Sequence, residues 1–283
     1  MTSNQELNKF PFSSISCRTN VLIFALSRHN PDNLAKLIHS VGYHPPREVF
    51  QDFCEMAAVA VSNAVDVLHR ETREAQYMRL IQRYKPKDQH LFRAMLDELQ
   101  QALEKDPSDI LGRLFMEVGG SNSRSGQFFT PESISQVLTD LTLADTGHVQ
   151  SLIEERGFIT LSEPSCGAGA MVIAFALRLR ELGINYQQHL HATLVDIDCR
   201  AVHMAYLQLS LLHIPALVVH GDTLTLKQHS SWYTLAHAMG LFGIKLRRGF
   251  SLDSARGREL IGNQSGHEDA DSLHERRKAM AIG

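Results

Sequence analysis

The sequence predicts an α/β fold in which a helical domain precedes a shortened, doubly wound parallel sheet. Residues 1–118 carry apolar side chains at the three- and four-residue spacing of helices. Beyond this region, short apolar strands alternate with helical segments, and a glycine or an acidic residue follows each expected strand. We therefore divide the chain into a helical domain (1–120), an α/β domain (121–250) and a polar tail (251–283).

The composition is that of an ordinary globular protein, with 43% hydrophobic and 21% charged residues. A net charge of −3 gives no overall attraction to nucleic acid, so binding to it requires a local basic patch. The apolar run at 21–26 is far shorter than the ~20 residues of a spanning helix, and we expect no membrane contact. Scattered cysteines without metal-ligand spacing predict reduced thiols, a cytoplasmic location and no metal site: Cys17, Cys54, Cys166 and Cys199.

The helical domain is predicted from two amphipathic segments at 57–68 and 91–103. A further short helix is expected at 110–118, with Ser108 as its N-cap and Gly119 ending it.

The α/β domain is expected to open with a helix whose N-cap is Thr130 and whose first residue is Pro131. Four apolar residues of this helix recur at i, i+3, i+4 and i+7, which predicts a stripe that faces the core: Ile134, Val137, Leu138 and Leu141.

Three strands are then predicted at 158–162, 190–195 and 216–219. The connecting segments, 170–182 and 199–212, read as helices, the second capped by Asp198. Strands and helices in this order form a right-handed parallel unit, half of a doubly wound sheet.

The segment from residue 227 onward contains no β-branched run, and we expect no fourth strand there. The strand at 158–162 is then left at the sheet edge, which needs cover. We expect the N-terminal helices or residues 235–244 to cover it, or a partner subunit or second copy of the chain to complete it.

The first glycine turn favours a nucleoside ligand that lacks a pyrophosphate. Gly167 and Gly169 let the backbone approach a ligand closely. The third small residue of the dinucleotide fingerprint is replaced by Val172, and no lysine–hydroxyl pair follows the loop.

Carboxylates follow the other two strands. Asp196, at the tip of the second strand, is placed to accept hydrogen bonds from both ribose hydroxyls, and its alternative role is to cap the next helix. Asp222, after the third strand, could receive a bond from an exocyclic adenine amine or simply stabilise its own turn. Cys166 is interpreted as a packing residue and not as a nucleophile.

These segments together resemble the N6-adenine DNA methyltransferases, especially the modification subunits of type I restriction systems, over residues 109–224. The chain looks like such a protein shortened after its cofactor-binding half. The resemblance implies a Rossmann-like methyltransferase domain that binds S-adenosylmethionine, with Thr130 at the carboxylate and Glu163 at the amino group of its methionine end. It also implies that Asp196 binds the ribose, Ile197 packs on the adenine and Asp222 recognises it. The implied cofactor residues are Phe129, Thr130, Pro131, Glu163, Ser165, Gly167, Gly169, Asp196, Ile197 and Asp222.

Catalytic residues stay unassigned, because the family's Asn/Asp/Ser-Pro-Pro-Tyr/Phe turn does not follow Asp222. In that family, this turn accepts the hydrogens of the adenine amine and stacks on the flipped base. The only Pro-Pro pair, at 45–46, lies between histidine and arginine. Trp232 and Tyr233 could stack on a base or form a lid over the core.

Two basic stretches could contact DNA phosphates: residues 70–87 and 245–258, each with a local charge of +4. The candidates are Arg79, Arg83, Lys85, Lys245, Arg247 and Arg248. Solvated helix faces give the same pattern, so both interpretations stay open.

Three functional hypotheses follow. The chain is an adenine-N6 DNA methyltransferase whose base-binding turn is divergent or supplied by another subunit. Alternatively, it is a non-catalytic S-adenosylmethionine-binding regulator, decoy or assembly subunit of a restriction-modification system. The third hypothesis is a methyltransferase that acts on protein or a small molecule.

Overall fold

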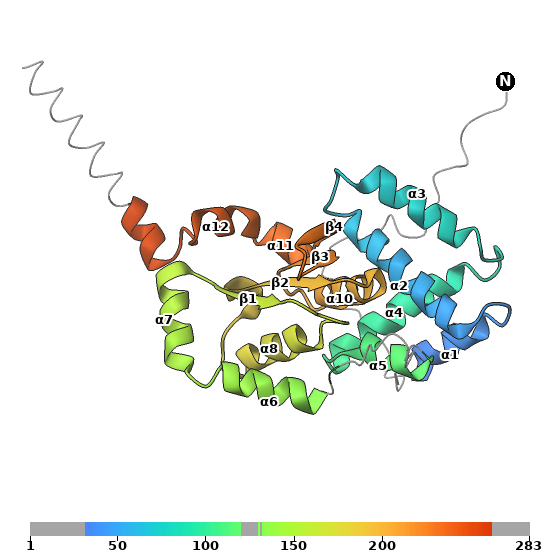
Figure 1. The fold of residues 1–283 in the computed structure, drawn as a ribbon, viewed down its shortest axis with the longest axis horizontal. Coiled ribbons are helices and arrows are strands. Elements are labelled where there is room, and N and C mark those ends of the chain that lie inside the picture. Colours follow the sequence, from blue (N-terminus) through green and yellow to red (C-terminus); the bar gives the residue numbers. More distant parts are fainter. Residues whose placement is uncertain (1–31, 120–129, 131, 262–283) are drawn as a thin grey trace, which may run out of the picture.

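The computed structural model describes residues 32–119, 130 and 132–261 (Figure 1). Five helices come first: α1 (Asp32–Ser40), α2 (Pro46–Ser62), α3 (Arg70–Ile81), α4 (His90–Lys105) and α5 (Ile110–Glu117). The α/β part then contains α6 (Glu132–Thr142), α7 (Thr146–Arg156), β1 (Ile159–Glu163), α8 (Ala170–Glu181), α9 (Tyr186–His189), β2 (Leu190–Asp196), α10 (Cys199–Leu211), β3 (Ala216–Asp222), β4 (Lys227–Tyr233), α11 (Leu235–Met239) and α12 (Phe242–Arg248).

The sheet has the order β1-β2-β3-β4, with β1, β2 and β3 parallel. Leu194 of β2 lies opposite Glu163 of β1 and Val218 of β3, so the carboxyl ends of the three strands meet at one edge. The three predicted strands and the helices between them are confirmed, and β1 lies at the sheet edge as expected.

Alternation along β2 separates the two faces of the sheet. Leu190, Ala192 and Leu194 are fully buried on the face that α10 packs against. Helix α10 in turn packs against α2, so it lies between the sheet and the N-terminal helices (Figure 1). His191 points to the other face, where its ring meets His237 of α11 and Phe242 of α12.

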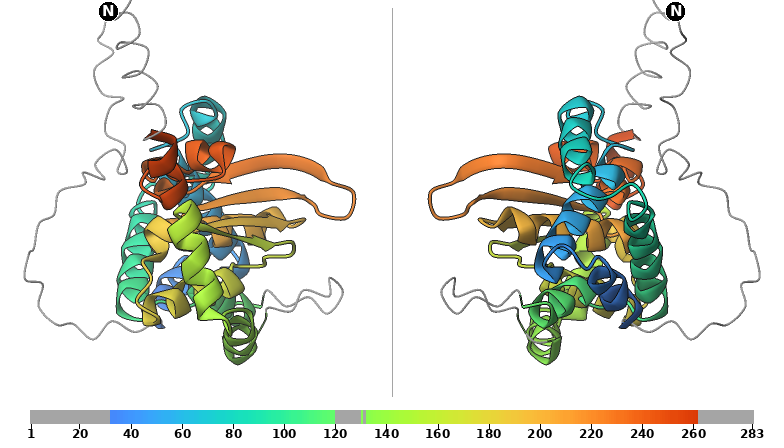
Figure 2. Two further views of the ribbon diagram at one scale, coloured as in Figure 1. Left: turned by 90° about the vertical axis from the view of Figure 1, so that its left-hand side faces the viewer. Right: turned by 90° about the vertical axis from the view of Figure 1, so that its right-hand side faces the viewer.

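The expectation of no fourth strand is wrong. Residues 227–233 form β4, which runs antiparallel to β3 in a hairpin that reaches beyond the other strand ends (Figure 2). Its sequence, Lys-Gln-His-Ser-Ser-Trp-Tyr, has low intrinsic β propensity, but pairing with β3 and burial of Trp232 (4% exposed) outweigh this.

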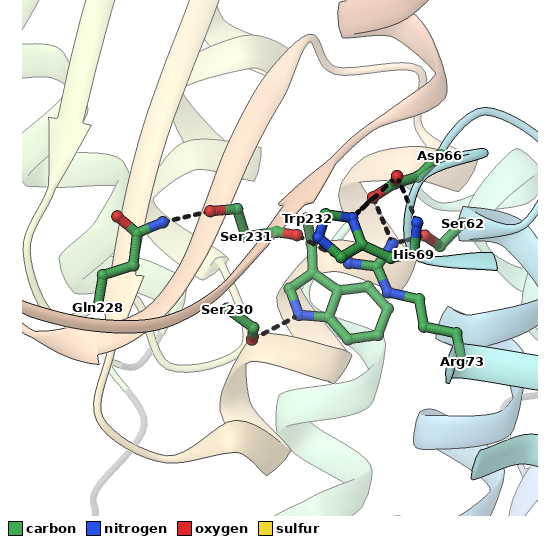
Figure 3. Close-up of polar contacts among 8 residues, drawn as sticks. All are labelled: Ser62, Asp66, His69, Arg73, Gln228, Ser230, Ser231 and Trp232. Carbon is green, nitrogen blue, oxygen red and sulfur yellow. Dashed lines mark hydrogen bonds and ion pairs between the residues drawn. The ribbon is translucent and has the colours of Figure 1, made fainter. Parts of the chain in front are cut away.

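A buried arginine joins β4 to the N-terminal helices (Figure 3). Arg73 of α3 donates hydrogen bonds to Asp66 (2.7 Å), to the carbonyl oxygen of Ser231 (2.8 Å) and to Ser62. Its guanidinium carbon lies 3.9 Å from the ring centroid of Trp232, a cation–π contact. Trp232 is therefore part of the core, which leaves Tyr233, 39% exposed, as the accessible member of the pair.

Helix α6 forms as predicted, but its apolar stripe does not face the core. Ile134, Val137, Leu138 and Leu141 are 43–69% exposed, while the small polar residues Ser135 and Thr139 are buried against the rest of the protein. The helical period predicts that these side chains share a face, but neighbouring elements decide which face is buried, and α6 packs against α8.

Other expectations need local correction. The N-cap of α5 is Asp109, which accepts from the amide of Gly112 at 2.8 Å, and not Ser108. Helix α2 ends at Ser62, six residues earlier than predicted.

Helix α7, which the sequence did not indicate, packs on the edge strand β1. Near the start of this strand, the ring of Phe158 contacts the ring of Phe242 of α12 edge to face.

The segment after α12 packs against the end of α7. The amide of Ser251 donates to the carbonyl of Arg156 at 2.7 Å, Ser251 and Ser254 are buried, and residues 255–261 are helical. The remainder of the predicted tail, 262–283, lies outside the described residues. Within the described residues, no helix has the length and apolar character needed to cross a bilayer.

Candidate functional site

The glycine loop between β1 and α8 has a backbone that ordinary residues seldom adopt. Gly167 has φ of 53° and Gly169, the N-cap of α8, has φ of 92°. The loop is held internally by the amide of Gly169, which donates to Cys166 at 2.8 Å, and it is held to β2 by the amide of Cys166, which donates to Val195 at 3.0 Å. A side chain at either glycine would strain this turn.

Asp196 connects the tip of β2 to this loop. One carboxylate oxygen accepts from the amide of Gly167 at 2.8 Å, and the other accepts from the amide of Asp198 at 2.9 Å. Asp196 is 9% exposed, and burial raises the pKa of its carboxyl despite these hydrogen bonds. Each oxygen of an ionised carboxylate has about two acceptor positions, so both can take a further donor.

Glu163, at the end of β1, lies on the same edge of the sheet. Its carboxylate accepts from the amide of Ser165 at 3.3 Å. Burial is the main cause of its raised pKa, and the negative charge of Asp196 contributes in the same direction. The structure therefore brings four predicted residues, Glu163, Ser165, Gly167 and Asp196, into one hydrogen-bonded corner.

The tip of β3 is tied to the same corner by two residues for which the sequence predicted no binding role. Thr223 donates to the carbonyl of Pro164 at 2.6 Å, and His220 Nε2 lies 3.2 Å from the carbonyl oxygen of Ile197. Both residues lie within two positions of Asp222 in the sequence. These contacts place the loops after β1, β2 and β3 side by side.

Asp222 and Ile197 are the exposed members of the predicted set. Asp222 accepts from the amides of Leu224 (2.9 Å) and Thr225 (3.3 Å), and hydrogen bonds from the side chain of Thr225 and from these amides lower its pKa. It thus stabilises its own turn, which was one of its two predicted roles. The Ile197 side chain is 67% exposed.

Thr130 lies apart from this corner. It lines a cavity of about 620 Å³ between α5, α6 and α8, whose walls include Asp109, Ala170 and Arg178. Neither Glu163 nor Asp196 lines this cavity. Phe129 and Pro131 lie outside the described residues, so their predicted roles stay predictions.

Cys166 is unsuited to act as a nucleophile. It is 6% exposed, and burial, followed by the charges of Asp196 and Glu163, raises the pKa of its thiol well above the ordinary value. Within residues 32–119, 130 and 132–261, His, Cys, Asp and Glu form no cluster of three or more that could hold a metal ion.

The first group of candidate DNA-binding residues is largely engaged within the protein. Arg83 pairs with Asp52 at 2.7 Å and with Glu48 at 3.1 Å, and the Lys85 ammonium lies 4.5 Å from the ring centroid of Tyr43. Arg79 is exposed. Such pairing leaves Arg83 less suited to a phosphate contact than its sequence position indicates.

The second basic group lies on α12, which is separated from α3 along the long axis of the molecule (Figure 1). Lys245 lies over the ring of Phe242 at 4.6 Å, and Arg247 donates to the carbonyl of Gly243 at 3.0 Å. Arg247 and Arg248 are exposed. The two groups do not form one continuous surface.

Comparison with known proteins gives a match over the region that contains this corner. Residues 109–239 match the family described as N-6 DNA Methylase. Two solved structures are similar. One is described as a class I S-adenosylmethionine-dependent methyltransferase, from Listeria monocytogenes (17% identity, 69% of this chain, 51% of that chain, TM-score 0.40). The other is the methyltransferase subunit of a type I restriction-modification system from Streptococcus thermophilus (18% identity, 68% of this chain, 43% of that chain, TM-score 0.40).

The chain spans about half the length of the first of these structures and less than half of the second. No curated protein matches the chain. The resemblance predicted over residues 109–224 is confirmed by the family match, which extends from residue 109 to residue 239.

Proposed function

We propose that this chain binds S-adenosylmethionine at the carboxyl ends of β1, β2 and β3, as a protein of the adenine-N6 DNA methyltransferase type. The observation that carries the proposal is the bond between Asp196 and the amide of Gly167, because it places an acidic strand tip directly against a glycine loop of positive φ. In parallel α/β sheets, this arrangement is the usual site for a nucleoside ligand.

The residues present fit the cofactor. Asp196 has acceptor capacity for two ribose hydroxyls, and the exposed Ile197 offers an apolar surface for the adenine ring. Glu163 is assigned to the amino group of the methionine end and Asp222 to the exocyclic amine. Thr130 lines the neighbouring cavity and not this corner, so its role at the methionine carboxylate rests on the family resemblance alone. Phe129, Pro131, Ser165, Gly167 and Gly169 complete the proposed binding set.

S-adenosylmethionine, when bound, supplies a methyl group on a positively charged sulfur. The chain's own residues hold the nucleoside and the methionine end, and we assign none of them to activation of an adenine amine. Loss of one preorganised polar contact to a reacting group typically costs about 3 kcal/mol, roughly a hundredfold or more in rate. We therefore expect methyl transfer by this chain alone to be slow or absent.

The structure favours the non-catalytic alternative in one respect. The segment after Asp222 forms the antiparallel β4, and its only tryptophan is buried against Arg73, where it cannot stack on a flipped base. The alternative function is a regulator, decoy or assembly subunit of a restriction-modification system. DNA, a partner subunit at the β1 edge and a cytoplasmic location belong to the proposal. Methyl transfer to protein or a small molecule stays a second alternative.

Calorimetric titration with S-adenosylmethionine tests the binding proposal. Wild-type protein should bind one equivalent, and Ile197→Asp should weaken binding at least tenfold, because a charge would face the adenine ring. Leu141→Asp is the matched control, since Leu141 is almost equally exposed (69%) and lies on α6, away from this corner. Absence of binding by the wild type, or equal loss in both variants, would overturn the assignment.

Transfer of tritiated methyl groups to unmodified DNA, with and without cell extract, separates the alternatives. Incorporation by the purified chain alone would contradict the non-catalytic function. Incorporation that requires extract would indicate a partner subunit, and incorporation only into protein would favour the second alternative.

A further inference from the structure

Gln208 is a polar side chain in the middle of the apolar helix α10. Its neighbours in sequence, Leu207 and Leu209, are fully buried, and so is Gln208 itself, with 0% exposure. A buried amide destabilises a protein unless its donors and acceptor are hydrogen-bonded. Gln208 must therefore have partners that justify its position.

Those partners come from two separate parts of the chain. Gln208 Oε1 accepts from the amide of Leu111 at 2.9 Å, and Nε2 donates to Asp109 Oδ1 at 2.9 Å, both at the start of α5. Nε2 also donates to the carbonyl oxygen of Ala168 at 2.9 Å, in the glycine loop. One amide thus joins the last of the N-terminal helices to the turn between Gly167 and Gly169.

Only glutamine supplies this set of bonds. Glutamate lacks the two N–H donors, methionine has the length but lacks both donors and a strong acceptor, and asparagine is one methylene shorter. Since both N–H groups and the carbonyl oxygen are used, the side chain has a single orientation. The carbonyl of Ala168, and with it the peptide plane that leads into Gly169, is fixed by that orientation.

The glycine loop is consequently held from two sides. Asp196 fixes the amide of Gly167 from the β2 side, and Gln208 fixes the carbonyl of Ala168 from the α10 side. We propose that Gln208 is a positioning residue that sets the conformation of the glycine loop and couples it to the start of α5. If the ligand is the one given under Proposed function, docking of α5 and binding of that ligand support each other.

Amide hydrogen exchange in the ligand-free protein tests the coupling. Gln208→Met should accelerate exchange in residues 165–170 by about tenfold, within the range expected when a buried polar group such as the Ala168 carbonyl loses its hydrogen-bond partner. The amides of Cys166, Gly167 and Gly169 are bonded in the wild type and report this opening. Exchange in β2 and β3 should change no more than global stability requires.

Leu207→Met is the matched control, because it also alters a fully buried side chain of α10 while conserving volume. It should leave exchange in the glycine loop unchanged. Loop exchange in Gln208→Met that is equal to that in Leu207→Met would overturn the proposal.

Titration with S-adenosylmethionine separates this inference from the proposed function. Wild-type binding with at least tenfold weaker binding by Gln208→Met, but not by Leu207→Met, supports both. Faster loop exchange with unchanged affinity would overturn the link between Gln208 and the ligand. If the wild type does not bind, the proposed function fails, and loop exchange alone still decides whether Gln208 positions the loop.

A second pair of variants covers the case in which Gln208→Met does not fold. Asp109→Ala removes the oxygen that accepts from Gln208, whereas Asp109→Asn keeps an acceptor oxygen there. The alanine variant should accelerate exchange in the glycine loop and the asparagine variant should not. Equal exchange in both would contradict the coupling.

Discussion

Besides the packing of α10 on α2, two polar junctions of different chemistry join the N-terminal helices to the α/β part of the molecule. Gln208 joins α5 to the glycine loop through a neutral amide, whereas Arg73 joins α3 to β4 through a buried guanidinium paired with Asp66. A neutral amide can fix a ligand loop without adding a buried charge of its own. A charged junction is costly to disrupt, because it leaves a buried ion without its partner.

Arg73→Met is expected to have the largest effect, because it breaks the charged junction. Burial raises the pKa of Asp66, but hydrogen bonds from His69 and the charge of Arg73 outweigh burial and lower it overall. Removing Arg73 should lower the free energy of unfolding by about 3 kcal/mol, measured by urea denaturation.

Trp232 is the only tryptophan of the chain, so its fluorescence reports directly on this junction. In Arg73→Met the native emission should shift to the red as β4 loosens. Arg73→Lys, which keeps a charge but not the planar fork, should lose less stability. A loss below about 0.5 kcal/mol in Arg73→Met, the range of ordinary surface changes, would show that the charged junction contributes little.

Acid is expected to have the next largest effect, at the opposite face of the sheet. His191 Nε2 lies 2.9 Å from His237 Nδ1, and burial, with the nearby His237, lowers the pKa of His191 to about 4. Protonation is therefore easier in the unfolded chain, and stability should fall as the pH drops from about 6.5 to about 4. The loss from His191 is on the order of 3 kcal/mol.

His191→Gln should flatten this pH dependence, because the amide keeps a hydrogen-bond partner for His237 but cannot ionise. Burial is the main cause that lowers the pKa of His203 to about 4, and His203 contributes equally to the pH dependence of stability in both proteins. Carboxyl groups with raised pKa values, such as that of Asp196, increase stability as the pH falls. The pH profile of His191→Gln is therefore compared with that of the wild type and is not interpreted alone. Identical pH profiles would contradict the assignment.

Gly169→Ala tests the glycine loop, which the neutral amide of Gln208 holds, and its expected loss of stability is smaller. The backbone at Gly169 has φ of 92°, a conformation that costs an alanine about 1–2 kcal/mol. The added Cβ would lie 3.5 Å from the Cβ of Ala205, which is an ordinary van der Waals contact. Gly183→Ala is the matched control, with φ of 77° and open space around the added carbon. Both should lose similar stability, but only Gly169→Ala should weaken binding of S-adenosylmethionine.

Substitutions on α6 should have the smallest effect and set the baseline. Val137→Ser and Leu141→Ser change side chains that are 58% and 69% exposed, and each should alter stability by less than about 0.5 kcal/mol. Val172→Ser, at a fully buried position of α8, should cost several times more. A large loss from Val137→Ser would mean that the stripe does face the core, as its sequence period predicted.

The sequence predicted the parallel half of the sheet because its signals are local. Apolar runs bounded by Gly167, Asp196 and Asp222 mark strands and turns without reference to the rest of the chain. Strand β4 could not be predicted in this way, since Trp232 becomes a strand residue only through pairing with β3 and contact with Arg73, 159 positions earlier.

The candidate site also contains residues with local sequence signals and residues whose role depends on the tertiary fold. Glycine and acidic residues at strand ends indicated Glu163, Gly167 and Asp196, and the structure brings these together. The contacts of Gln208 depend on the docking of α5 against the glycine loop, which no local pattern encodes. The signal that could have drawn attention to it is a lone glutamine inside an apolar helix, since such a residue needs buried partners.

The proposed nucleoside site lies across the carboxyl ends of β1, β2 and β3. A crystal structure of the protein with S-adenosylhomocysteine, the demethylated form of the cofactor, tests this most directly. We expect the ribose hydroxyls to donate to the carboxylate of Asp196 and the adenine to lie against Ile197. A nucleoside found instead in the cavity beside α8, away from both residues, would contradict it.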